Sequence, residues 1–176
     1  MEAHKIQIKH AENENLLDIE LCAKEFIDFI DNFKKNFLEG RFFILTAYYD
    51  FILAGVLIAE KKVREIDSLE KIIPSIQLHL LSKRFYLLFV NSKFRNNQIG
   101  TKLLESFINI QKQNDIASIY IELPQKYKIG INFLQKKSFQ RIGKKQNNVI
   151  LELKLWNDYG IIDSQVIEDD FNDILS

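Results

Sequence analysis

The first 40 residues contain two patterns of apolar side chains. The first is typical of a strand, and the second is typical of a helix. Residues 5–9 alternate between polar and apolar side chains, which predicts a short edge strand. Over residues 16–37, apolar side chains recur at helical spacing, which predicts a long helix or a pair of helices that Gly40 ends. Aromatic and aliphatic residues at this spacing are usually core residues, so we expect this face to lie in the core rather than to form a ligand box.

Two stretches rich in β-branched and aromatic residues follow. Residues 41–49 and 51–60 have the composition of strands, and they are separated only by a short polar step near Asp50. This arrangement predicts an antiparallel hairpin. Gly55 lies inside the second strand, where a glycine often marks a β-bulge.

Residues 63–81 mix two patterns. Pro74 separates a first part with helical spacing from a second part in which apolar residues alternate. We therefore expect a helix followed by a segment whose type the pattern leaves open. The helical positions are Val63, Ile66, Leu69 and Ile73, and the alternating ones are Ile76, Leu78 and Leu80.

The middle of the chain predicts a β-α-β unit. Residues 85–90 form an unbroken apolar run of strand length, which is typical of a central strand covered on both faces. A helix is predicted from near Gln98 to residue 110, and residues 116–123 predict a second strand that Pro124 ends. Such a unit has parallel strands and a right-handed crossover.

A short helix and a hairpin complete the predicted sheet. The helix covers residues 127–137, and the hairpin pairs residues 139–144 with residues 149–155. The helix positions expected to face inward are Ile129, Phe133 and Leu134.

Composition narrows the functional classes. Lys plus Arg equals Asp plus Glu at 24 each, so no overall field favours nucleic acid or an anionic membrane, and we expect neither as a partner. The single cysteine, Cys22, rules out an internal disulfide, and without a secretion signal we expect a cytoplasmic protein. No apolar stretch is long enough to span a bilayer. The three histidines lack cysteine partners at ligand spacing, so no metal site is predicted.

The C-terminal tail, residues 156–176, combines acidic with apolar residues. It has the pattern of a docking helix, and its acidic residues indicate either a solvated helix face or a clasp for a partner or for a second subunit in a homodimer. No linker or repeat divides the chain, so we expect one domain over residues 1–176.

The loop between the apolar strand and its helix has the features of an anion cradle. The strand stops at Asn91, and Asn96 or Asn97 can cap the helix. The first turn of a helix leaves backbone N–H groups without intrahelical partners at the positive end of the helix dipole. These donors suit a phosphate group.

The run from Val90 to Thr101 resembles the pyrophosphate loop of the GNAT N-acetyltransferase superfamily, whose pattern is Arg/Gln-x-x-Gly-x-Gly/Ala. The family binds acetyl-coenzyme A (acetyl-CoA) there. Gln98 stands at the first glycine of the pattern, so its side chain must point away from a bound phosphate. The resemblance implies a cofactor-binding set of Phe89, Val90, Arg95, Asn96, Asn97, Gln98, Ile99, Gly100 and Thr101.

Residues 121–139 resemble a second GNAT segment. Glu122 falls on the strand glutamate that acts in some members as general base toward the acceptor amine; otherwise it is an exposed polar residue at a strand end. An amine with a pKa near 10 must lose a proton before it attacks a thioester, so a carboxylate within reach is needed. The family's usual asparagine, tyrosine and glycine are replaced here by Tyr127, Leu134 and Ser138.

Together, these features imply an α/β (α+β) fold with a mixed, mostly antiparallel sheet of six to seven strands, a central parallel pair and flanking helices. The expected function is transfer of an acetyl group from acetyl-CoA to a primary amine of a small molecule or peptide, with Glu122 as catalytic base. Residues 63–81 would be an insertion beside the acceptor site. The alternatives are a catalytically silent GNAT-like domain that binds coenzyme A (CoA) or a protein, and an unrelated α/β interaction module.

Overall fold

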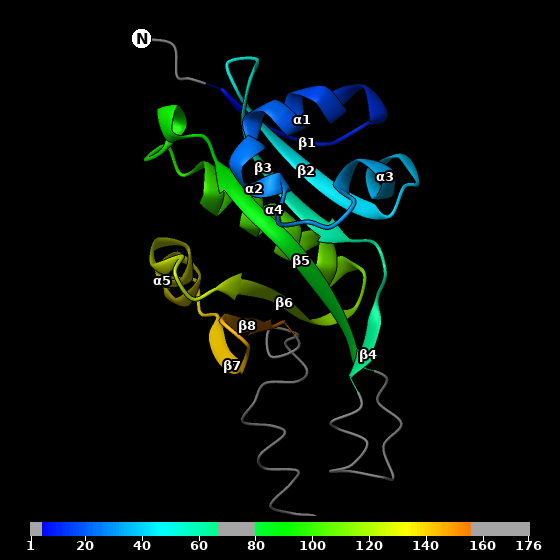
Figure 1. Cartoon of the computed structure of the whole chain (residues 1–176), viewed down its shortest axis with the longest axis vertical. Coiled ribbons are helices and arrows are strands. Elements are labelled where there is room, and N and C mark those ends of the chain that lie inside the picture. Colours follow the sequence, from blue (N-terminus) through cyan, green and yellow to red (C-terminus); the bar gives the residue numbers. More distant parts are fainter. Residues whose placement is uncertain (1–4, 67–79, 156–176) are drawn as a thin grey trace, which may run out of the picture. The chain divides into compact units, whose positions relative to one another are not determined.

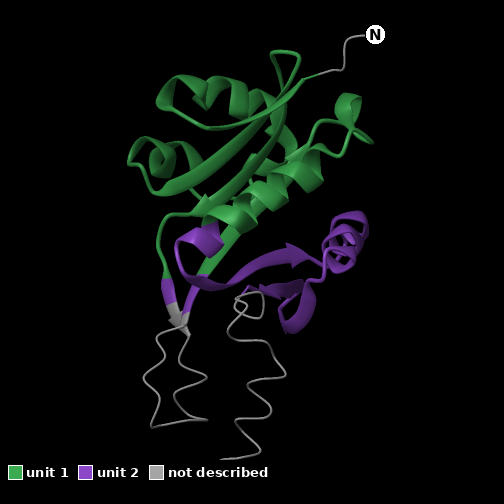
Figure 2. Ribbon diagram, turned by 180° about the vertical axis from the view of Figure 1, so that it is seen from behind, with its two compact units in different colours: residues 1–63, 83–110 green, residues 64–82, 111–176 purple. Residues whose placement is uncertain are grey.

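The computed structural model describes residues 5–66 and 80–155, which form two compact units (Figures 1 and 2). Unit 1 contains residues 1–63 and 83–110, and unit 2 contains residues 64–82 and 111–176. Within the described residues, the two units together contain seven strands besides the short strand β4. The single domain expected over residues 1–176 stays a prediction.

The N-terminal helical stretch of unit 1 is divided into short helices. After the 3-10 turn η1 (Asn13–Asn15) come α1 (Leu16–Cys22), α2 (Lys24–Ile27) and α3 (Phe33–Leu38). The chain leaves helical geometry at Ala23, and Asn32 has a left-handed backbone with φ of 52°. The predicted long helix or helix pair is therefore wrong in number, although Gly40, with φ of 70°, follows the last helix as expected.

The sheet of unit 1 contains β1 (Ile6–His10), β2 (Phe42–Tyr49), β3 (Ile52–Glu60) and the greater part of β5 (Leu80–Val90). Neighbouring strands in this order are antiparallel, and β2 and β3 form the predicted hairpin. The register of the hairpin shifts between the pairs Ala47–Gly55 and Tyr48–Leu53, which leaves Ala54 as the extra residue. The bulge thus lies beside Gly55, as predicted.

Helices cover both faces of this sheet. On one face, α1 to α3 pack against alternate strand residues such as Ile44, Val56 and Ile58. On the other face lies α4 (Ile99–Gln113), whose Phe107 contacts the ring of Phe85 at a centroid distance of 5.7 Å. The long apolar runs of β3 and β5 follow from this arrangement, because a strand covered on both faces has no solvent-facing side.

Residues 64–66 correct one prediction. Where helical spacing predicted a helix from Val63, the structure has strand β4 (Arg64–Ile66), which pairs antiparallel with the first residues of β5. A partner strand provides backbone hydrogen bonds that spacing alone does not reveal. The rest of the expected insertion, residues 67–79, and the acidic tail, residues 156–176, lie outside the described residues.

Unit 2 contains β6 (Ile116–Pro124), α5 (Lys128–Lys136), β7 (Gln140–Lys145) and β8 (Asn148–Lys154). Strand β8 lies between β6 and β7 and is antiparallel to both, so the predicted terminal hairpin is confirmed. Leu134 is buried at 3% exposure, as expected for an inward position of α5. The inward assignment of Ile129 is wrong, because this side chain is 84% exposed in the first turn of the helix.

Candidate functional site

The loop that follows β5 is held by hydrogen bonds within unit 1. The N–H of Asn91 donates to the carbonyl of Ala54 at 2.8 Å, which anchors the start of the loop on β3. The Asn91 side chain then accepts a hydrogen bond from the N–H of Lys93 at 3.0 Å and opens the 3-10 turn η2 (Ser92–Phe94). The polar residue that ends the strand therefore also shapes the turn after it.

The rest of the loop is fixed by side chains that point back into it. The ring of Phe94 packs against Tyr49 of β2 at 5.4 Å. The Arg95 Nε donates to the Val90 carbonyl at 3.4 Å, and the Asn97 Nδ2 donates to the Phe94 carbonyl at 3.1 Å. Arg95 and Asn97 are nevertheless exposed, so the loop is ordered and also accessible to a ligand.

Gln98 is the last residue before α4. Its carbonyl accepts the first helical hydrogen bond, from the N–H of Lys102 at 3.0 Å. Neither Asn96 nor Asn97 therefore occupies the capping position that the sequence suggested. Gln98 has φ of 60°, a left-handed conformation that L-residues other than glycine adopt at a cost. The exposed Gln98 thus has the glycine-like backbone conformation although it is not glycine.

The start of α4 presents backbone donors next to positive charge. Ile99 is buried at 2% exposure and fixes the helix on the sheet, whereas Gly100 and Thr101 are half-buried. The first N–H groups of a helix have no intrahelical acceptors. Residues 91–104 contain Lys93, Arg95 and Lys102 and no acidic residue. This part of the chain can hold a dianion such as a phosphate group.

Gly55 allows α4 to lie close to the end of β5, a role that the sequence did not reveal. A Cβ atom at this position would come 2.9 Å from the Phe89 carbonyl oxygen and 3.1 Å and 3.2 Å from side-chain atoms of Leu103 and Ile99. Such distances are shorter than carbon atoms tolerate, so only glycine fits without a shift. The signal in the sequence was the glycine itself within an apolar strand.

Phe89 and Val90 are the last residues of β5. The side chain of Phe89 packs in the core, whereas the main chains of both residues pair with β3. The ring of Phe89 packs against Phe26 of α2 at 5.0 Å, on the face that α1 to α3 cover. In the register with β3, Phe89 pairs with Val56 and Val90 pairs with Gly55. The side chain of Phe89 therefore serves the core, and any ligand contact at this position falls to its main chain.

Glu122 lies in unit 2, near the end of β6. Its side chain is half-buried, and its Oε1 accepts a hydrogen bond from the Asn148 Nδ2 at 3.0 Å. Asn148 begins β8, and Glu122 pairs with Ile150 in the register of the two strands. The carboxylate thus has a fixed position on the sheet and is not a freely moving surface group.

The other residues of the second segment are also in unit 2. Leu134 is buried in the core and offers no hydroxyl group. Tyr127 is the residue that precedes α5, and its ring contacts the Lys126 ammonium at 5.4 Å. Ser138, which replaces the usual glycine after this helix, has φ of 73°. The two positions where this chain replaces a glycine of the resemblance, Gln98 and Ser138, therefore both have left-handed backbones.

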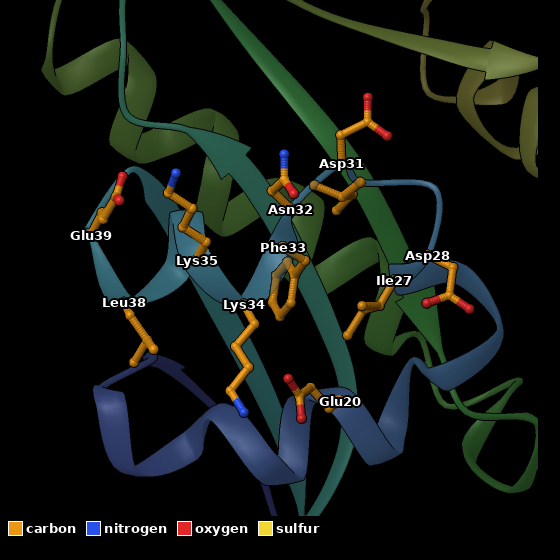
Figure 3. Close-up of a pocket in the computed structure, with 11 residues that line it drawn as sticks. Glu20, Ile27, Asp28, Asp31, Asn32, Phe33, Lys34, Lys35, Leu38 and Glu39 are labelled. Carbon is orange, nitrogen blue, oxygen red and sulfur yellow. The ribbon is translucent and has the colours of Figure 1, made fainter.

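A concave area of unit 1 lies over the helices. It is an open depression formed by residues of α1 to α3 and the segments between them (Figure 3). Its rim mixes acidic and basic side chains, and it contains none of the predicted site residues. The described residues include no group of three or more His, Cys, Asp or Glu side chains able to hold a metal ion, and no helix among them is long and apolar enough to cross a bilayer.

The site in unit 1 is a polar turn between strand β5 and helix α4 of an α/β protein. No family model matches the chain, and no curated protein does. Solved structures do match. Arabidopsis thaliana NAA60 in complex with acetyl-CoA has a TM-score of 0.70 at 12% identity, with 86% of this chain and 99% of that chain covered.

Two further structures show the same likeness. The PaiA N-acetyltransferase of Thermoplasma acidophilum in complex with coenzyme A has a TM-score of 0.63 at 16% identity, over 85% of this chain and 99% of that chain. Arabidopsis thaliana Naa50 with the bisubstrate analogue CoA-Ac-MVNAL has a TM-score of 0.63 at 14% identity, over 84% and 97%. The chain therefore has the GNAT fold, which confirms the predicted fold class of an α/β (α+β) protein with a mostly antiparallel sheet and flanking helices.

Proposed function

We propose that the protein is an N-acetyltransferase that transfers the acetyl group of acetyl-CoA to a primary amine. The observation that carries the proposal is the loop between β5 and α4, in which Gln98 has φ of 60° and the helix start is free of acidic residues. Left-handed backbone at a non-glycine residue is kept where surrounding structure demands it, and such positions cluster at ligand sites. The fold supports the same function, because the similar structures named above are N-acetyltransferases.

The residues of the loop fit the pyrophosphate of acetyl-CoA. The first N–H groups of α4, from Ile99 to Thr101, would donate to the phosphate oxygens, and Arg95 would add a charge-assisted hydrogen bond. Arg95 would exchange its 3.4 Å contact with the Val90 carbonyl for the stronger bond to an anion. The main-chain groups of Phe89 and Val90 would bind the pantetheine arm. Backbone atoms therefore provide most of the binding.

Acetyl-CoA would supply an acetyl thioester, and the chain would supply a base. In the proposed reaction Glu122 takes a proton from the ammonium form of the acceptor, directly or through a water molecule. The neutral amine nitrogen then forms a bond to the carbonyl carbon, and the bond from that carbon to sulfur breaks. The electron pair leaves with the thiolate, whose pKa near 8.5 allows departure without a dedicated acid. Leu134 could not supply such an acid.

Binding is tested by calorimetric titration of the full chain with acetyl-CoA and with free CoA. We expect micromolar affinity for both, and we expect Arg95→Glu to weaken it at least tenfold, because a charge-assisted hydrogen bond contributes roughly 1.5–3 kcal/mol and the new carboxylate repels phosphate. Lys24→Glu is the matched control, since Lys24 is exposed on α2 and the substitution makes the same change in net charge. Equal loss in both variants, or no binding to the wild type, contradicts the cradle.

Catalysis is tested with a panel of amine acceptors and the variant Glu122→Gln. We expect acetylation to fall at least a hundredfold while acetyl-CoA affinity is unchanged, since general base catalysis contributes typically 10²–10⁴-fold. Glu152→Gln is the control, because Glu152 is also half-buried and accepts a hydrogen bond from Ser118 at 3.4 Å on the adjacent strand. Activity of Glu122→Gln equal to that of the control removes Glu122 from the proposed role.

The second candidate function is a GNAT-like domain that binds CoA or a protein without catalysis. One observation favours it: Leu134 is 3% exposed and belongs to the core, where many GNAT members have a tyrosine that protonates the thiolate. This candidate predicts binding of CoA that Arg95→Glu weakens, together with no acetyl transfer to any amine of the panel. The titration and the activity panel together separate the two functions.

A further inference from the structure

The neutral net charge of the chain conceals a strong separation of charge within unit 2. Residues 111–155 contain nine Lys or Arg and three Asp or Glu, an excess of six positive charges. Residues 156–176, the tail that follows directly, contain six Asp or Glu and no Lys or Arg. The two excesses are equal and opposite.

The positive charges lie on α5 and on the strand that follows it. Between Glu122 and Glu152 there are seven Lys or Arg and no acidic residue. Six of the seven, from α5, the residue after it and β7, are what we call the basic surface, and all of them except the half-buried Lys137 are exposed: Lys128, Lys136, Lys137, Arg141, Lys144 and Lys145. Within the described ranges, residues 5–66 and 80–155, no carboxylate forms an ion pair with any of these six side chains.

The basic surface also has exposed apolar side chains and an uncovered strand edge. Ile129 on α5 is 84% exposed, and Ile142 on β7 is 55% exposed because the register of β7 skips it between Arg141 and Gly143. Among the described strands β7 pairs only with β8. Lysines on an edge strand are a common protection against unwanted strand pairing, which explains Lys144 and Lys145. It explains neither the lysines of α5 nor the exposed Ile129.

We propose that the acidic tail of the same molecule, residues 156–176, docks on the basic surface. The tail offers six carboxylates together with apolar residues, which matches lysines interspersed with exposed isoleucines. Attachment in one chain makes the encounter intramolecular, with an effective concentration in the millimolar range.

The tail begins where it can reach the surface. The N–H of Leu155 donates to the Ala117 carbonyl at 2.7 Å, so the chain is fixed to the sheet up to this residue. Glu152 pairs with Gln140, so the tail leaves β8 at the end of the hairpin where β7 begins, and α5 ends four residues before Gln140. An extended chain spans roughly 3.3 Å per residue, so the tail is several times longer than the six-residue strand β7.

Zero-length carbodiimide coupling tests the docking directly. The purified full chain, treated with nuclease, is mixed as equal parts of ordinary and nitrogen-15-labelled protein, coupled at low salt and mapped by peptide mass spectrometry. We expect amide bonds between tail carboxylates and lysines of the basic surface within one isotopic species. Internal controls are four exposed lysines of unit 1: Lys24, Lys34, Lys35 and Lys62. Coupling to the basic surface should exceed coupling to the controls at least fivefold and fall severalfold in 1 M salt, where the Debye length is only about 3 Å.

A full-length variant in which four of the six tail carboxylates are neutralised provides the second measurement. Its changes are Asp163→Asn, Glu168→Gln, Asp169→Asn and Asp170→Asn. With folding checked by circular dichroism, acetylation of Lys136, Lys144 and Lys145 by a small activated ester should rise at least twofold relative to the four control lysines. Coupling no greater than at the controls, or an unchanged labelling ratio, overturns the proposal. Bonds that join the two isotopic species assign the surface to a second copy of the chain. Protection of these lysines that disappears on nuclease treatment assigns the surface to nucleic acid. Either result also overturns the proposal.

Discussion

Gln98→Gly is the substitution that tests most directly whether the loop before α4 has a glycine-like geometry. Gln98 is exposed, has φ of 60°, and contributes its carbonyl to the first helical hydrogen bond. Glycine keeps the carbonyl and removes the clash of a Cβ atom with the backbone. The substitution therefore changes the conformational energy of one residue, while the hydrogen bonds of Asn91, Arg95 and Asn97 that hold the loop stay unchanged.

The expected magnitude follows from two opposing effects. The left-handed conformation costs a non-glycine residue roughly 1–2 kcal/mol. Glycine loses more conformational entropy on folding, which costs roughly 0.5–1 kcal/mol. We therefore expect Gln98→Gly to raise the free energy of unfolding by about 0.5–1 kcal/mol. The loop keeps its donors, so acetyl-CoA should bind at least as tightly as to the wild type.

Urea denaturation followed by fluorescence of Trp156 and the tyrosines measures the change. With a slope of roughly 2 kcal/mol/M, the midpoint should rise by about 0.3–0.5 M. Asn97→Gly is the control: Asn97 is the adjacent residue, is not among the left-handed positions, and loses hydrogen bonds to the carbonyls of Phe94 and Arg95, at 3.1 Å and 3.4 Å. Its midpoint should fall. If Gln98→Gly lowers the midpoint as much as Asn97→Gly does, the left-handed conformation of Gln98 is refuted.

The remaining predictions concern glycine positions and the single thiol. Gly55→Ala should lower the free energy of unfolding by about 2–3 kcal/mol, because the new Cβ would lie 2.9 Å from the Phe89 carbonyl oxygen. Gly130→Ala should raise the free energy of unfolding by about 0.5–1 kcal/mol, because a Cβ at this position meets nothing within 4 Å. Thermal melts of both variants check these changes. Ser138→Gly should raise the free energy of unfolding by about 0.5–1 kcal/mol, and a fall in a urea melt would contradict the φ of 73°. Burial raises the pKa of the Cys22 thiol from 9.0 to about 11, so at pH 8 its reaction with a disulfide reagent should be about 100-fold slower in the folded chain than in urea; equal rates would refute the burial. Because this raised pKa lets the folded chain bind the proton more tightly than the unfolded chain, Cys22 should stabilise the fold less as pH rises from about 9 to 11, and Cys22→Ala should flatten that fall.

Sequence patterns predicted the parts of the fold in which one rule dominates. The hairpin of β2 and β3 and the apolar run of β5 follow from burial on both faces, which requires continuous apolar sequence. The division of residues 16–38 into short helices could not be predicted in the same way. The apolar spacing continues through it, while the left-handed backbone at Asn32 depends on packing against the sheet. Helical spacing from Val63 failed because strand pairing with β5 provides more backbone hydrogen bonds than an isolated turn would.

In the candidate site too, features that depend on neighbouring residues were predictable, and features that depend on residues far apart in the sequence were not. The donors at the start of α4 were predictable, because they follow from the helix itself. The role of Gly55 was not predictable, because it depends on how close this residue lies to Phe89 and Leu103. These two residues belong to a strand and a helix that are far from Gly55 in the sequence. Ile129 was assigned to the core from spacing alone, but the first turn of a short helix has few neighbours to cover it.

In the proposed function, binding and catalysis would depend on different kinds of atoms, so the chain could keep one set while changing the other. The proposed cradle uses backbone N–H groups, and these persist when Gln98 replaces glycine because the backbone keeps its left-handed geometry at this position. In the proposed reaction an acid would be a side chain, and Leu134 has no hydroxyl group to serve as one. Glu122, whose Oε1 accepts a hydrogen bond from the Asn148 Nδ2 at 3.0 Å, would be the base of the proposed reaction, without a matching acid. Transfer to amines should therefore be limited by departure of the thiolate, and a thioester with a more acidic thiol should react faster on this protein, while binding through the cradle changes little.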